Sequence, residues 1–177
     1  EPGLSGSFAD ASRQAIDVMA PVAEERGIRL GSEIDDQLEK LEGRFAFAIL
    51  TNVIRNAIES IERSGRHDGR IEVSARLEPG KTGRGVVIEV LDNGEGPPEL
   101  PARGGESVFR LGFTTKPGGT GVGLAFCREL VQELGGTISL TDREQVKSGK
   151  DQGRGAAFRA LIPLGASQRT KEEPLQS

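Results

Sequence analysis

Apolar residues recur at helical spacing in three stretches of the chain, which predict helices over residues 7–26, 44–63 and about 121–134. Ser7 and Asp10 have the spacing of a capping box, which supports a helix start at residue 7. Pro21 weakens the first prediction, because a proline inside a helix kinks or ends it. The second stretch has the strongest pattern, and its apolar face contains Phe45, Phe47, Ile49, Leu50, Val53, Ile54, Ala57, Ile58 and Ile61.

Shorter apolar runs predict five strands, over residues 28–34, 70–77, 85–91, 137–141 and 156–163. The turn-rich residues 78–84 separate the second and third strands and predict a hairpin. The order of elements, with a long loop after residue 91, predicts one mixed sheet with helices packed on a face. The fold class is therefore α/β, in two layers.

The composition excludes several classes of function. The 177 residues suffice for one domain with a core, and a net charge of −4 argues against nucleic acid as the main partner. The single cysteine, Cys127, excludes an intramolecular disulfide and fits the reducing cytoplasm. With only one histidine, His67, a metal site built from histidine and cysteine is excluded as well. No apolar run approaches the ~20 residues of a membrane span.

Glycine accounts for 25 of the 177 residues, about twice its usual share. Nine of these glycines lie within residues 94–123, together with four prolines. The clustering predicts a loop there rather than regular structure. Three segments contain residues that could act on a ligand, one on the second predicted helix and two in or next to this window.

The first segment lies on the second predicted helix. Asn52, Asn56 and Glu59 are spaced so that their side chains share one stripe. The stripe is either a solvated surface or a row of amides facing a ligand. In the second case the amide oxygens could bind a hard cation and the amide NH2 groups could bind phosphate oxygens.

The second segment follows the strand predicted over residues 85–91. Asp92 ends this strand, and Gly94 and Gly96 allow the backbone to approach a ligand closely. The carboxylate could accept a hydrogen bond from an exocyclic amine, with room for a flat ring beside it. The alternative is an Asx turn that only closes the strand.

The third segment, residues 118–124, is rich in glycine and directly precedes the third predicted helix. Unpaired N–H groups at a helix start form an anion site, and Lys116 lies just before them. The spacing fits neither a Walker P-loop nor a Rossmann fingerprint.

Together the segments resemble the catalytic, ATP-binding domain of sensor histidine kinases, in the superfamily of gyrase B, Hsp90-type chaperones and MutL-type ATPases. The boxes of that domain correspond to residues 52–57 (N box), 92–96 (G1 box), 109–116 (F box), 119–124 (G2 box) and 153–155 with Phe158 (closing glycine motif). The resemblance extends over about residues 7–163. It implies the Bergerat-type ATP-binding fold, a two-layer α/β sandwich with a mostly antiparallel sheet, helices on one face and a mobile ATP lid.

The resemblance also implies a role for each site residue. Asn56 is expected to bind Mg2+, and Asn52 the triphosphate or the waters of the metal. Asp92 is expected to accept a hydrogen bond from the adenine amino group, with Gly94 and Gly96 making room for the base. The remaining phosphate contacts are expected from Lys116, Thr120, Gly121, Val122, Gly123 and Leu124. No residue is assigned as catalytic acid, base or nucleophile.

The same resemblance implies an ATP-binding domain over residues 1–164 with a lid over about 97–118, and the polar composition of residues 165–177 predicts a disordered tail. Hydrolytic members of the superfamily have a glutamate four residues before the metal asparagine. Asn52 stands there instead, so phosphoryl transfer is favoured over hydrolysis. Two positions depart from the common pattern: Glu59 replaces a basic residue, and Ser60 replaces an aromatic ring that often stacks on adenine.

His67 lies in a polar turn and is not expected to be the phosphoacceptor. The implied partners are the dimerisation and phosphoacceptor domain of the same parent kinase, which could be membrane-anchored, and a response regulator receiver domain. The isolated domain is expected to be monomeric. Two other functions stay open: a serine kinase of the anti-sigma type, and a nucleotide sensor without catalysis.

Overall fold

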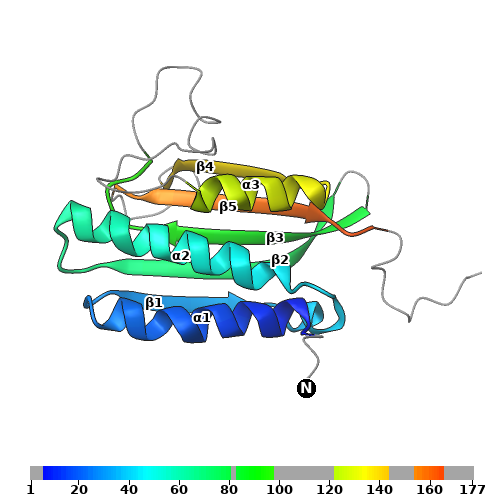
Figure 1. Cartoon of the computed structure of the whole chain (residues 1–177), viewed down its shortest axis with the longest axis horizontal. Coiled ribbons are helices and arrows are strands. Elements are labelled where there is room, and N and C mark those ends of the chain that lie inside the picture. Colours follow the sequence, from blue (N-terminus) through cyan, green and yellow to red (C-terminus); the bar gives the residue numbers. More distant parts are fainter. Residues whose placement is uncertain (1–5, 81–82, 98–121, 144–153, 166–177) are drawn as a thin grey trace, which may run out of the picture.

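The computed structural model describes residues 6–80, 83–97, 122–143 and 154–165. The elements run in the order α1 (Phe8–Glu24), β1 (Arg29–Ile34), the 3-10 helix η1 (Asp36–Lys40), α2 (Phe45–Ser64), β2 (Arg70–Gly80), β3 (Gly83–Asp92), α3 (Gly123–Glu133), β4 (Thr137–Asp142) and β5 (Ala156–Pro163). The helices α1, α2 and α3 cover one face of a single sheet (Figure 1). The predicted two-layer α/β class is confirmed.

The sheet has five strands in the order β1-β2-β3-β5-β4. β1 pairs with β2 in parallel, and the other three pairs are antiparallel, so the sheet is mixed and mostly antiparallel. β2 and β3 form the predicted hairpin, but their pairing continues to Gly80 opposite Gly83, through most of the segment expected to be a turn. The central position of β3 places its last residue, Asp92, beside the start of β5.

The helix ends agree with the local sequence signals. The Asp10 N–H donates to Ser7 Oγ at 3.0 Å, which confirms the predicted cap of α1. Gly65 ends α2 in the left-handed region at φ 68°, which glycine adopts without steric cost. Pro21 does not end α1, which continues to Glu24. The proline lies on the exposed side of the helix, where water can satisfy the carbonyl that it leaves without a donor.

The core fills the space between α2 and the sheet. Ile49, Leu50, Ile54 and Ile58 of α2 are at most 2% exposed and belong to one cluster with Ile88 and Phe158 of the sheet. The prediction for Phe47 is wrong, since its side chain is 38% exposed. It lies on the first turns of α2, beyond the apolar stripe that reaches the sheet.

Cys127 joins α3 to this core. Its side chain is completely buried, and its sulfur lies 3.9 Å from the Ile49 carbonyl oxygen. Burial raises the pKa of the thiol to about 12, so it stays protonated at neutral pH. Cys127 therefore acts as a small buried apolar side chain.

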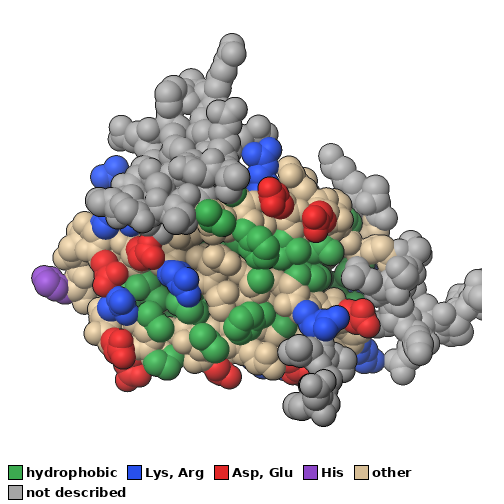
Figure 2. All heavy atoms as spheres, viewed as in Figure 1, with side chains coloured by type: hydrophobic (Ala, Val, Ile, Leu, Met, Phe, Trp, Pro, Cys, Tyr) green, Lys and Arg blue, Asp and Glu red, His purple; other side chains and the backbone are tan. Residues whose placement is uncertain are grey.

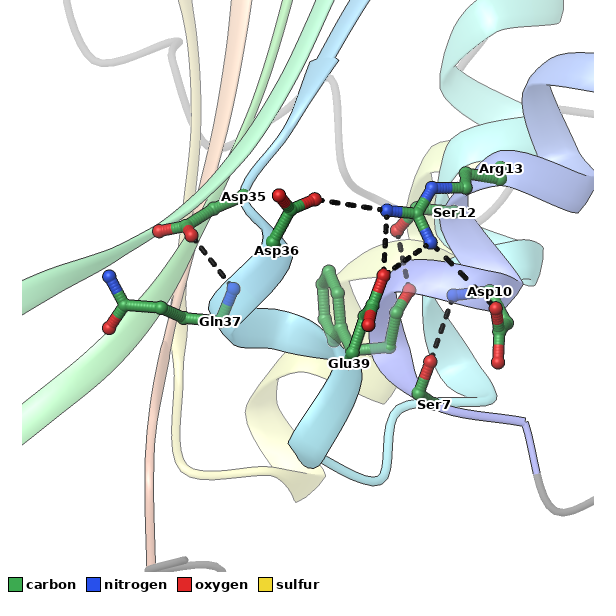
Figure 3. A network of polar contacts seen from close by, with 9 residues as sticks. Ser7, Asp10, Ser12, Arg13, Asp35, Asp36, Gln37 and Glu39 are labelled. Carbon is green, nitrogen blue, oxygen red and sulfur yellow. Dashed lines mark hydrogen bonds and ion pairs between the residues drawn. The ribbon is translucent and has the colours of Figure 1, made fainter.

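A polar network on the surface joins α1 to η1, an element that the apolar pattern did not predict (Figure 3). The Arg13 guanidinium lies 3.2 Å from Glu39 and 3.4 Å from Asp36, and the Asp35 side chain caps η1 by accepting from the Gln37 N–H at 2.9 Å. These groups are exposed, so their ion pairs contribute little stability. Among the described helices, none is long and apolar enough to cross a membrane.

Candidate functional site

Asp92 ends β3 with its carboxylate almost fully buried, at 5% exposure. Its Oδ1 accepts hydrogen bonds from the backbone N–H groups of Gly94, at 2.8 Å, and Ala156, at 3.3 Å. Within the described part of the chain, both of these bonds end on the same oxygen. The other oxygen, Oδ2, accepts no hydrogen bond from the described residues, so it is the oxygen to which an additional donor would bind.

The environment of this carboxylate raises its pKa toward neutral pH. Burial raises the pKa of Asp92 to about 6, because it penalises the charged form. The N–H groups of Gly94 and Ala156 oppose this shift, as do the positive charges of Arg143 and Arg63. Arg143 is itself only 3% exposed, and its guanidinium lies 3.6 Å from Glu72 on β2.

Three glycines lie in the segments around Asp92, and a side chain at each of them would be crowded or strained. A Cβ on Gly94 would overlap Ser60 Oγ, and a Cβ on Gly155 would overlap the carbonyl oxygen of Asp92. Gly96 has φ 87°, which favours glycine, and its backbone passes close to Gly155. A Cβ on Gly96 would lie 3.3 Å from the Gly155 carbonyl oxygen. The G1 box and the closing glycine motif are thus packed against each other, which is why both are glycine-rich.

Asn93 fastens this segment to the loop that joins α2 to β2. Its side-chain oxygen accepts from the Arg70 N–H at 2.7 Å, and its side-chain nitrogen donates to the Asp68 carbonyl at 3.0 Å. The residue is 3% exposed, so these bonds are shielded from water. No role was predicted for Asn93, although an asparagine directly after the strand-ending aspartate was a usable signal in the sequence.

The structure also brings the N box and the G2 box together. A Cβ on Gly123, the first residue of α3, would lie 3.0 Å from Asn52 Oδ1. The Asn52 side-chain nitrogen donates to the Ala48 carbonyl at 2.8 Å, so the amide oxygen is directed toward the start of α3. Asn52 is half-buried rather than solvated, which favours the ligand-facing interpretation of the stripe.

The other predicted site residues are only partly described. Asn56 is half-buried, one turn after Asn52 on α2, and Leu124 packs against the core, so only its backbone is available to a phosphate. Lys116, Thr120, Gly121 and the lid residues 98–118 lie outside the described residues. His67 is exposed in the loop after α2, as expected, and projects from the surface in Figure 2.

The donor set near the start of α3 suits a hard cation carried by a nucleotide. Among the described residues, no group of three or more histidine, cysteine, aspartate and glutamate side chains could hold a metal. Amide oxygens such as those of Asn52 and Asn56 are hard donors, and Mg2+ commonly takes one or two protein ligands together with phosphate oxygens and water. The residues present therefore fit Mg2+ bound together with a polyphosphate.

The fold and this site define an ATP-binding catalytic domain of the kind found in histidine kinases. Residues 42–166 match the sequence profile of the family described as histidine kinase-, DNA gyrase B-, and HSP90-like ATPase. The chain belongs to this family. The resemblance found in the boxes of the sequence is confirmed.

Individual relatives agree with this assignment. The nitrogen regulation protein NtrY of Azorhizobium caulinodans is 35% identical over 126 residues, 70% of this chain and 14% of NtrY. The alginate biosynthesis sensor protein KinB of Pseudomonas aeruginosa is 32% identical over 161 residues, 90% of this chain and 24% of KinB. The chain therefore spans less than a third of the length of these relatives.

A solved structure also supports the fold. The catalytic domain of histidine kinase ThkA superposes with a TM-score of 0.65 and 25% identity, covering 89% of this chain and 92% of that domain. The similarity covers nearly the whole of the ThkA domain, so this chain has the fold of such a catalytic domain.

Substitution of Gly155 tests whether the contact between the two glycine motifs is needed. Gly155→Ala places a methyl group on the Asp92 carbonyl oxygen, so we expect the free energy of unfolding to fall by about 1–3 kcal/mol. Gly31→Ala on β1 is the matched control, because its Cβ has nothing nearer than 4.0 Å. Urea denaturation measures both, and equal stability of the two variants would contradict the packing described.

Proposed function

We propose that this domain binds ATP with Mg2+ and presents the γ-phosphoryl group to a histidine on a separate phosphoacceptor domain. The observation that carries the proposal is the buried Asp92 carboxylate, whose Oδ2 is available to the amino group of adenine. A carboxylate accepts from an amino group and repels the carbonyl oxygen that guanine has at the same place, so it selects ATP over GTP. Gly94 and Gly96 leave room for the base.

The phosphates belong at the start of α3 in this proposal. Backbone N–H groups from Thr120 to Leu124 and the Lys116 ammonium would bind them, and the amide oxygens of Asn56 and Asn52 would hold Mg2+. The metal, when bound, neutralises charge that develops on the transferred phosphoryl group. Residues 97–118 would form the lid over the nucleotide, and residues 165–177 a tail outside the domain of residues 1–164.

Transfer rather than hydrolysis is supported by Asn52. A neutral amide cannot act as a general base toward water, and the Asn52 nitrogen is engaged by the Ala48 carbonyl. The γ-phosphoryl group then persists until an acceptor side chain reaches it. The acceptor would belong to the remainder of a longer sensor kinase with a response regulator as its final partner, and this domain would lie in the cytoplasm.

An exposed apolar surface suits the docking of that acceptor domain. Phe47, Val122 and Phe126 are 38%, 47% and 43% exposed, an unusual exposure for large apolar side chains. Figure 2 shows hydrophobic side chains gathered where α3 lies beside α2, close to the proposed phosphate site. A helical hairpin bound there would have its histidine near the γ-phosphate.

Nucleotide titration tests the binding half of the proposal. Wild-type protein should bind a non-hydrolysable ATP analogue more tightly with Mg2+ than without, and more tightly than the GTP analogue. Asp92→Ala removes a charged acceptor, so its affinity for the ATP analogue should fall about tenfold or more. Asp17→Ala, an exposed carboxylate on α1, is the control. Absence of binding by the wild type, or an unchanged adenine preference in Asp92→Ala, would contradict the assignment.

Transfer to a separately supplied phosphoacceptor hairpin tests the second half. Radiolabelled ATP should give acid-labile phosphate on the hairpin, and His67→Ala should transfer at the wild-type rate because His67 lies in an exposed loop. Acid-stable phosphoserine on a partner protein would indicate the serine kinase, and nucleotide binding without transfer would indicate the sensor. Label on His67 itself would show that the phosphoacceptor is wrongly assigned.

A further inference from the structure

Ser60 supports the segment that follows Asp92. The sequence indicated only that this serine stands where related domains often have an aromatic ring. It lies near the end of α2, is 8% exposed, and its Oγ accepts a hydrogen bond from the Glu95 N–H at 3.1 Å. Because a Cβ on Gly94 would overlap the same hydroxyl, the backbone of residues 94 and 95 rests directly on Ser60. An aromatic ring at position 60 would need this backbone to move away.

A second contact, from the next turn of α2, holds Glu95. Arg63 Nε lies 2.9 Å from Glu95 Oε2, with both side chains partly exposed. The ion pair adds little energy there, but it restricts the side chain of the residue whose backbone Ser60 holds. Asn93 fixes the segment on its other side through Arg70 and Asp68.

The backbone held by Ser60 also contains a hydrogen-bond donor to the Asp92 carboxylate. The Gly94 N–H, one residue before Glu95, donates to Asp92 Oδ1 at 2.8 Å. Displacement of residues 94 and 95 would therefore lengthen that bond and turn the carboxylate. The direction of Oδ2 depends in this way on a hydroxyl that has no hydrogen bond to Asp92 among the described residues.

We propose that Ser60 is a positioning residue for base recognition: its hydroxyl sets the place of the Gly94–Glu95 backbone and thereby aims the Asp92 carboxylate at the amino group of the purine. The inference rests on the proposed ATP function and adds to it a residue that determines specificity. The small size of Ser60 and its hydroxyl both matter, since one admits the Gly94 backbone and the other fixes it.

The test compares ATP with purine riboside triphosphate, which lacks only the 6-amino group, on the whole chain by calorimetry. The ratio of the two affinities isolates the contact with Asp92 from binding of the sugar and phosphates. Ser60→Ala should reduce this ratio about fivefold, the effect of losing one hydrogen bond, while affinity for purine riboside triphosphate stays nearly constant. Ser60→Thr restores the hydroxyl with one added methyl group at a crowded position, so it should recover part of the ratio.

Ser12→Ala is the matched control, a buried serine on α1 whose hydroxyl donates to the Phe8 carbonyl, and it should keep the wild-type ratio. A wild-type ratio in Ser60→Ala, a loss that Ser60→Thr does not reduce, or an equal loss of affinity for both nucleotides would overturn the role of Ser60 alone. A wild-type protein that binds neither nucleotide, or binds both equally, would overturn the proposed function and this inference with it.

Discussion

The constraint on which the site depends is the burial of one carboxylate. Asp92 is nearly inaccessible to water, and within the described ranges its charge is compensated by two backbone N–H groups and by the positive charges of Arg143 and Arg63. Compensation of this kind is incomplete, as the raised pKa shows. A ligand that donates a hydrogen bond to Oδ2 would reduce the remaining cost, so in the proposed function the burial that destabilises the empty domain would also select the base.

The glycines of the two motifs beside Asp92 follow from this burial. Two N–H groups reach one carboxylate oxygen only if the segments that carry them approach within backbone distance. Gly94 rests on α2 at Ser60, and Gly155 lies against the carbonyl of Asp92. Any side chain at either glycine would separate the segments, which is why a ligand site made mainly of backbone needs residues without Cβ atoms. The helix α2 then joins this site to the core.

Local signals predicted the elements well, and contacts between distant segments account for what they missed. The cap at Ser7 is encoded within a few residues and was predicted, and the helix over residues 44–63 was predicted to within one residue at each end. The polar stripe and Asp92 were also visible, since an asparagine or aspartate beside apolar residues needs a reason. The exposure of Phe47 was not predicted, because Phe47 lies at the margin of the apolar face of α2, where burial depends on contacts with other elements. The role of Ser60 depends on a residue 35 positions away.

The pKa of Asp92 offers the most direct test of this account, measured by carbon NMR of the side-chain carboxyl with and without nucleotide. In the empty domain it should titrate at about 6, above the ordinary 3.8. Because the folded-state pKa is raised, the contribution of Asp92 to the free energy of unfolding is fully present below about pH 4. As the pH rises through 6, that free energy falls by about 3 kcal/mol. A bound adenine amino group favours the charged form, so ATP should lower the pKa. An ordinary pKa in the empty domain, or a pKa that ATP leaves unchanged, would contradict the central role of this buried carboxylate.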